Sequence, residues 1–160
     1  MRLKLTIILA VTGTFLFTQN AIADPKPQNV KVTGAQDLAN LYGGKTQIWK
    51  GCKGGIYFGA NWEAQAYCAK HPDSVGLGKW RIDGKGRVCH EMNWYRAKDG
   101  EVASKEKKEE CVSHVTAEDG IVWRSWPDDR EWWKATNSPS LEKGFKFKSK
   151  VKRLRRKLKL

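Results

Sequence analysis

Four cysteines constrain what this chain can fold into more than any other feature of its sequence. Cys89 and Cys111 are equidistant from Gly100, and Asp99-Gly100-Glu101 is a suitable three-residue hairpin loop. In such a hairpin the two cysteines face each other on neighbouring strands, at the Cα separation that a disulfide needs. We therefore expect a β-hairpin closed by a cystine.

Cys52 and Cys68 repeat this arrangement around Ala60. A turn at this position places Phe58 opposite Trp62 and predicts a second hairpin with its own cystine. Spacing alone leaves the two other pairings of the four cysteines open. A zinc site made of the four thiolates is the rival hypothesis, and the absence of a C-x-x-C pair disfavours it.

The N-terminus has the features of a cleaved secretory signal. Two basic residues precede an apolar stretch over residues 5–17, and Ala21 and Ala23 supply the small residues that a signal peptidase requires. The sequence predicts cleavage between Ala23 and Asp24 and a periplasmic or secreted protein, where disulfides are favoured. An uncleaved anchor is the alternative, although the stretch is short for a membrane span.

Beyond this segment the chain indicates one short helix followed by many short strands. Leu38, Leu41 and Tyr42 recur at helical spacing after Thr33, and two glycines end the run. The expected strands, separated by turns rich in Pro, Asp and Gly, are 46–50, 55–58, 62–67, 79–83, 87–96, 110–116, 120–126 and 131–135. This pattern predicts a mainly β fold, an antiparallel meander that forms a small barrel or sandwich.

The length is that of one domain. The expected organisation is a signal peptide at 1–23, an extended linker at 24–33, a disulfide-stabilised β-domain at 34–136 and a basic tail at 137–160.

The net charge of +13 is concentrated in that tail. Ten of the 30 Lys and Arg residues follow Glu142, and no acidic residue does. Without these ten and without Arg2 and Lys4, 18 basic residues balance 17 acidic ones, so the body is nearly neutral. Positive charge gathered in this way predicts a polyanionic partner.

The tail combines two patterns. Residues 145–148 alternate like a strand, whereas Val151, Leu154 and Leu158 stand at helical spacing and would form an apolar stripe under a cationic face on binding. We expect nine cations to dock the protein on an anionic envelope surface, lipid or lipopolysaccharide. These are Lys146, Lys148, Lys150, Lys152, Arg153, Arg155, Arg156, Lys157 and Lys159. A solvated, disordered tail is one alternative, and a nucleic-acid-binding tail, which export disfavours, is another.

The order of several short motifs resembles a proteobacterial family of small exported proteins, the domain-of-unknown-function family numbered 995. The residues that carry the resemblance are Leu41-Tyr42-Gly43-Gly44-Lys45-Thr46, Trp49, Gly78, Trp80, Ile82, Gly86-Arg87-Val88-Cys89, Trp94, Cys111, His114, Asp119-Gly120, Val122, Trp123 and Trp132. The resemblance covers about 37–135 and implies an exported domain without an established activity or catalytic residues. The pair Cys52 and Cys68 and the long basic tail depart from the family's pattern.

No catalytic motif accompanies these features. H-E-x-x-H, G-x-S-x-G and a phosphate-binding glycine loop are all missing. On a strand Cys89 and His90 point to opposite faces, so His90 is not a base for Cys89 and is expected to pack against the core. We therefore expect no catalytic residues, no metal and no cofactor, and favour a protein that is not an enzyme.

The tryptophans are divided between core and surface. We expect Trp80, Trp94 and Trp123 to fill a small β core. The candidate ligand surface consists of Trp126, Trp132 and Trp133, which flank the turn Pro127-Asp128-Asp129.

Together these features predict an exported, non-enzymatic β-domain that docks on an anionic envelope component through its basic tail. An enzyme or enzyme inhibitor that acts on envelope polymers through the tryptophan surface is the alternative, and nucleic-acid binding by the tail is a third. The oligomeric state stays open.

Overall fold

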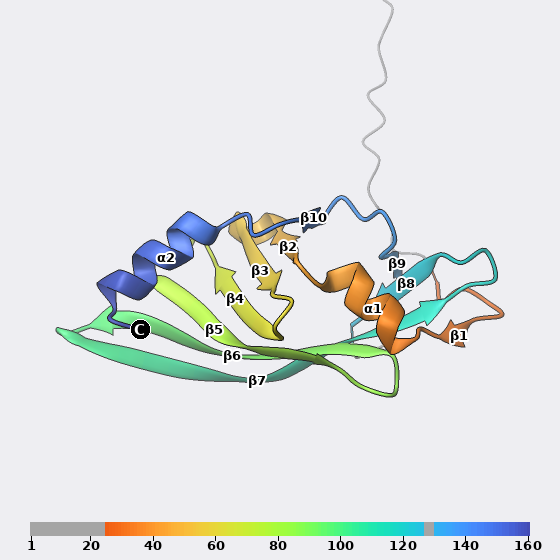
Figure 1. The fold of residues 1–160 in the computed structure, drawn as a ribbon, viewed down its shortest axis with the longest axis horizontal. Coiled ribbons are helices and arrows are strands. Elements are labelled where there is room, and N and C mark those ends of the chain that lie inside the picture. The colour runs from red at the N-terminus through yellow and green to blue at the C-terminus, as the bar shows by residue number, and fades with distance from the viewer. Residues whose placement is uncertain (1–24, 127–129) are drawn as a thin grey trace, which may run out of the picture.

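Short hairpin-connected segments of this kind build one curled antiparallel sheet in a computed structural model of the chain (Figure 1). The structure describes residues 25–126 and 130–160. The predicted signal peptide and its cleavage site, and the turn Pro127-Asp128-Asp129, lie outside the described residues.

Ten strands of the described chain form this sheet, in the order β10-β2-β3-β4-β5-β6-β7-β8-β9, with β1 paired to β7. The strands are β1 Lys31–Val32, β2 Lys45–Trp49, β3 Gly54–Phe58, β4 Glu63–Tyr67, β5 Ser74–Ile82, β6 Arg87–Lys98, β7 Glu101–Thr116, β8 Val122–Ser125, β9 Trp133–Lys134 and β10 Leu141–Lys143. The helices are α1 Ala35–Tyr42 and α2 Lys148–Lys157, and η1, Lys50–Cys52, is a 3₁₀ turn. The sheet curls into a half-barrel, which confirms the mainly β fold class.

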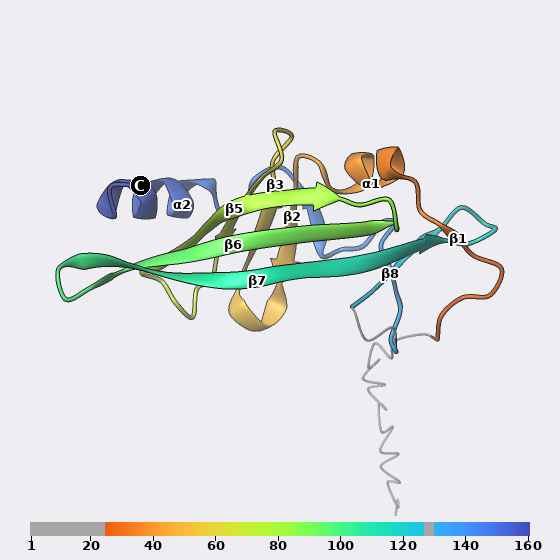
Figure 2. The same cartoon turned by 90° about the horizontal axis from the view of Figure 1, so that it is seen from below.

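The two helices lie toward opposite ends of the long axis, along which the β6–β7 hairpin runs (Figures 1 and 2). Each helix covers a different face of the sheet. Successive side chains of a strand point to opposite sides, so residues at alternate positions contact different helices. Ile56 and Ala66 pack with α1, whereas Tyr67 and Val75 pack with α2. We call these surfaces the α1 face and the α2 face. The sheet therefore has a hydrophobic core on both sides.

The β6–β7 hairpin pairs Cys89 with Cys111 as predicted, by a route that the spacing does not reveal. The turn holds two residues, Asp99 and Gly100, both with positive φ, and this loop shifts the register by one position from the three-residue loop expected. A bulge after His90 shifts it back. The cysteines consequently face each other with their Cα atoms 4.0 Å apart and form a disulfide.

The pairing of Cys52 with Cys68 is also as predicted, but the expected contact between Phe58 and Trp62 is wrong. Phe58 faces Ala64 instead, because the loop between β3 and β4 is longer than the expected turn. Trp62 lies in that loop with a positive φ of 65° and is 46% exposed. Cys52 precedes β3 and ends η1, and Cys68 directly follows β4. This cystine therefore ties a 3₁₀ turn to the end of β4.

Thiol chemistry checks both cystines. No cysteine of the chain is free, so iodoacetamide is expected to label none of them in the unfolded, unreduced protein and all of them after reduction. Mass spectrometry of the intact chain measures the label directly. Complete labelling without reductant would contradict the pairing.

Candidate functional site

The basic C-terminal segment is part of the folded body. Helix α2 buries Val151, Leu154 and Leu158 against Tyr67 and Val75 on the α2 face. A short helix is marginal in water by itself and gains its stability from such packing. The helix expected from the spacing is therefore present, but its apolar stripe faces the sheet of this protein and is not available to a lipid bilayer.

The segment that leads into α2 is also attached to the body. Strand β10 pairs with β2, and the amide of Lys146 donates to the hydroxyl of Thr46 at 3.1 Å. Phe145 and Phe147 do not form the strand expected from their alternation and instead pack against the hydrophobic cluster under α2. The domain thus extends through residue 158, past the boundary expected at residue 136.

The predicted cations of this segment are all exposed, and two of them form ion pairs. The ammonium group of Lys146 lies 2.9 Å from Glu142, and that of Lys157 lies 3.4 Å from Asp73. Exposed pairs of this kind stabilise a fold by about 1 kcal/mol or less. The structure therefore places seven of the nine predicted cations on α2, with Lys146 just before the helix and Lys159 just after it.

A groove with a volume of about 580 Å³ runs beside this helix. Its lining includes Tyr57 and Gln65, which are partners across β3 and β4. The ring of Phe145 stacks on Tyr57 with 4.4 Å between centroids and an interplanar angle of 7°. The helix contributes Lys148, Val151, Lys152, Arg155 and Arg156 to the lining, and the C-terminal Leu160 also lines the groove. Aromatic and cationic side chains thus line the same groove, a combination that sequence reasoning missed because Tyr57 and Gln65 are distant from the tail in the chain.

The predicted tryptophan surface is not brought together as expected. Trp126 is 45% exposed and Trp133 is half-buried, but Trp132 is only 1% exposed. The ammonium group of Lys26 lies over the Trp132 ring, 5.1 Å from its centroid. Because Trp132 is a core residue, it has no free face on which a sugar ring could stack. Of the predicted core tryptophans, Trp80 is buried, and Trp94 and Trp123 are half-buried.

Two of the three histidines, His90 and His114, pack within the fold. His90 packs edge-on against Phe58 and lies 3.7 Å from a carboxylate oxygen of Glu110, which agrees with the expected core position. His114 is almost completely buried, and its Nε2 is hydrogen-bonded to the hydroxyl of Tyr42 at 2.8 Å. Burial lowers the pKa of His114 to about 4, and the guanidinium of Arg124 acts in the same direction. Sequence reasoning missed this pair, which joins α1 to β7.

Arg124 belongs to a polar cluster that bridges the two edges of the curled sheet. It lies on β8 opposite His114 and donates hydrogen bonds to Gln47 of β2 and, at 3.0 Å, to Ser140 before β10. Gln47 also donates to Ser140 at 2.9 Å. Arg124 links strands near opposite edges, so we interpret the cluster as the seam that holds the half-barrel curled.

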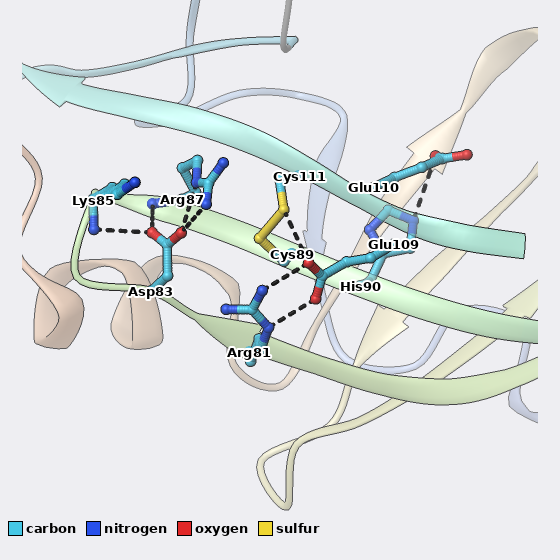
Figure 3. Close-up of a disulfide and its surroundings, with 9 residues drawn as sticks. All are labelled: Arg81, Asp83, Lys85, Arg87, Cys89, His90, Glu109, Glu110 and Cys111. Carbon is cyan, nitrogen blue, oxygen red and sulfur yellow. Dashed lines mark hydrogen bonds and ion pairs between the residues drawn. A yellow bond between two sulfur atoms is a disulfide. The ribbon is translucent and has the colours of Figure 1, made fainter.

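The surroundings of the Cys89–Cys111 disulfide do not form a metal site (Figure 3). Glu109 lies close to both sulfurs, but the thiols are oxidised and hold each other. The guanidinium of Arg81 donates two hydrogen bonds of 2.7 Å to the Glu109 carboxylate and lowers its pKa. Asp83 forms a second pair with Arg87 at 2.6 Å. These residues are an ion-pair network on the sheet surface.

A family model described as "Protein of unknown function (DUF995)" matches residues 7–155. The chain belongs to the DUF995 family. This match includes most of α2, so the basic helix that the sequence pattern set apart lies largely within the region that defines the family. No curated protein and no solved structure matches. The described helices include none with the length and hydropathy of a membrane span.

Proposed function

We propose that the protein is exported to the periplasm of a proteobacterium and docks there on an anionic surface of the cell envelope through the cationic face of α2. The observation that carries the proposal is a folded helix whose apolar stripe is buried and whose exposed positions, Ser149 apart, are filled by Lys and Arg. Two disulfides suit an oxidising compartment, and the N-terminal sequence suits a signal peptide.

This arrangement favours electrostatic docking over insertion. The apolar stripe already has its partner in the protein, so the helix presents a charged surface and no hydrophobic one. Each Lys or Arg held near an anionic lipid surface contributes about 1 kcal/mol. At 0.1 M salt the attraction is largely screened beyond a distance of about 10 Å. Several such cations on one rigid helix act together and retain a small protein at a membrane or at lipopolysaccharide.

Cosedimentation with vesicles that contain anionic phosphatidylglycerol tests the proposal. The test variant replaces Lys150, Arg153, Arg155 and Arg156 by Gln. The matched control replaces four exposed lysines of the body, Lys31, Lys50, Lys79 and Lys85, by Gln. It therefore has the same net charge as the α2 variant. We expect the α2 variant to bind at least about 100-fold more weakly and the control to bind within about threefold of the wild type.

Neutral vesicles and DNA complete the experiment. Neutral phosphatidylcholine vesicles should not retain the protein, and rising salt should release it from anionic ones. Equal weakening by the α2 variant and the body control would reject a role for the helix. Preferential binding to DNA at matched charge and salt would instead favour a nucleic-acid partner.

A further inference from the structure

The exposed cations of α2 form two groups on either side of the buried stripe, since an α-helix advances about 100° per residue. The groove flank consists of Lys148, Lys152, Arg155 and Arg156, and the outer flank consists of Lys150, Arg153 and Lys157. All members of the groove flank line the groove beside Tyr57 and Phe145, and no member of the outer flank does.

The groove flank holds positive charge that the described residues do not neutralise. Within residues 25–126 and 130–160, none of its four cations has an ion pair, whereas Lys157 of the outer flank is paired with Asp73. Lys152 stands one helical turn from both Lys148 and Arg156, and like charges at this spacing oppose helix formation. An anion bound between these side chains would remove that repulsion.

Apart from Gln65, the rest of the groove lining is largely apolar. Tyr57 and Phe145 present stacked rings, and Leu160, which is 40% exposed, adds aliphatic surface. Cations alone would suit any phosphate, and an apolar wall alone would suit any hydrocarbon. The two together match a molecule that carries both groups, and a volume of about 580 Å³ is within the range of about 300–1,000 Å³ typical of small-molecule sites.

We propose that this groove binds one molecule of a phosphorylated lipid. The phosphate lies between Lys152, Arg155 and Arg156. The guanidinium groups of the two arginines offer paired donors to its oxygens, and the ammonium group of Lys152 adds a point charge. The first carbons of an acyl chain lie along Tyr57 and Phe145. This inference rests on the proposed function for the class of partner, an anionic amphiphile, and adds a discrete site with a defined stoichiometry.

Titration calorimetry with short-chain phosphatidic acids, kept below their micelle concentration, tests the site. We expect dihexanoyl phosphatidic acid to bind one molecule per chain. Dibutyryl phosphatidic acid should bind more weakly, because each methylene that the groove covers raises the affinity by about fourfold. Glycerol 3-phosphate, which has the phosphate without the chain, should bind most weakly.

Two variants of equal net charge distinguish the groove from the rest of the helix. Replacement of Lys152, Arg155 and Arg156 by Gln should weaken binding of the dihexanoyl lipid by about 100-fold, whereas replacement of Lys150, Arg153 and Lys157 by Gln should change it by less than about threefold. Equal weakening by both variants, or equal affinity for glycerol 3-phosphate and the lipid, would overturn the proposal.

The vesicle experiment separates this inference from the proposed function. Wild-type protein that binds anionic vesicles but no monomeric lipid would reject the groove site and leave docking intact. Binding of the monomeric lipid without binding to vesicles would reject docking and support the groove site.

Discussion

Replacement of Leu154 by Asp is expected to unfold much of the protein, although the residue belongs to a tail that looks dispensable in sequence. The Leu154 side chain is only 2% exposed, between α2 and the sheet. Loss of a buried leucine costs about 2–5 kcal/mol, and burial of a carboxylate without a partner adds to that cost. The sum approaches the whole stability of a small domain, about 5–15 kcal/mol.

Urea unfolding followed by tryptophan fluorescence measures this effect. The matched control is the neighbouring Arg153→Asp, which makes a more negative helix at an exposed position and should lower the free energy of unfolding by about 1 kcal/mol or less. Leu154→Ala should fall between the two. Equal midpoints for Leu154→Asp and Arg153→Asp would mean that α2 is not docked on the sheet in solution.

Truncation is a poor substitute for these point variants. A chain that ends at Leu141 loses most of β10 together with α2 and exposes Tyr67 and Val75. Any loss of binding would then reflect damage to the fold as well as loss of charge. This is why the binding experiments above replace exposed cations and leave the buried stripe unchanged.

Hairpins are the part of the fold that could be predicted from the sequence, because their contacts are local. The β6–β7 hairpin shows both the strength and the limit of such predictions. The facing of Cys89 and Cys111 was predicted from symmetry around Gly100, but the two-residue turn and the bulge after His90 were not. The turn and the bulge shift the register in opposite directions, so the predicted pairing of Cys89 with Cys111 was correct although its derivation was incomplete. Where no second shift compensates, as at Phe58, the predicted contact was wrong.

Contacts between distant segments could not be predicted in the same way. The spacing of Val151, Leu154 and Leu158 predicted a helix with an apolar stripe, but many partners suit such a stripe. Its actual partners, Tyr67 and Val75, lie on strands whose inward and outward faces are both apolar. The alternation of a strand with two covered faces does not show which side a helix will occupy.

The buried pair of Tyr42 and His114 was invisible for a related reason. One residue ends a helix and the other lies within a long strand, and no local pattern connects them. Both residues are among those that carry the family resemblance, but a resemblance does not show which residues touch. A buried polar residue is costly unless it finds a partner, so the local signal for this pair would be an isolated histidine between apolar neighbours. His114 lies between Ser113 and Val115, which makes even that signal weak.

Acidification from pH 6.5 to 4 is expected to lower the free energy of unfolding by about 3 kcal/mol through His114 alone. In the unfolded chain a histidine has its ordinary pKa of about 6.5, whereas burial lowers the pKa of folded His114 to about 4. Between these values the unfolded state binds a proton that the folded state does not, so stability falls as the pH falls. The slope is half its maximum at pH 6.5 and at pH 4, and it vanishes about one pH unit beyond each of these values.

The charged neighbour of His114 acts in the same direction as burial. Arg124 on β8 repels a positive charge on the ring, and Tyr42 on α1 is uncharged throughout this range because burial raises its pKa. Backbone carbonyls of Gly86 and Val112 act in the opposite direction on the pKa of His114, but burial outweighs them. A charged His114 therefore opposes the packing of α1 on the seam of the half-barrel.

Urea unfolding of two variants between pH 7.5 and 4 isolates this contribution. His114→Gln keeps a hydrogen-bonding side chain next to Tyr42 and is expected to be less stable at neutral pH but to lose the His114 part of the pH slope. His71→Gln is the matched control, because His71 is exposed in the loop before β5, and should keep the wild-type slope. The same slope in both variants would show that His114 is protonated in the folded protein. In that case the fold would tolerate a positive charge on His114, next to Arg124 and the polar cluster of the seam.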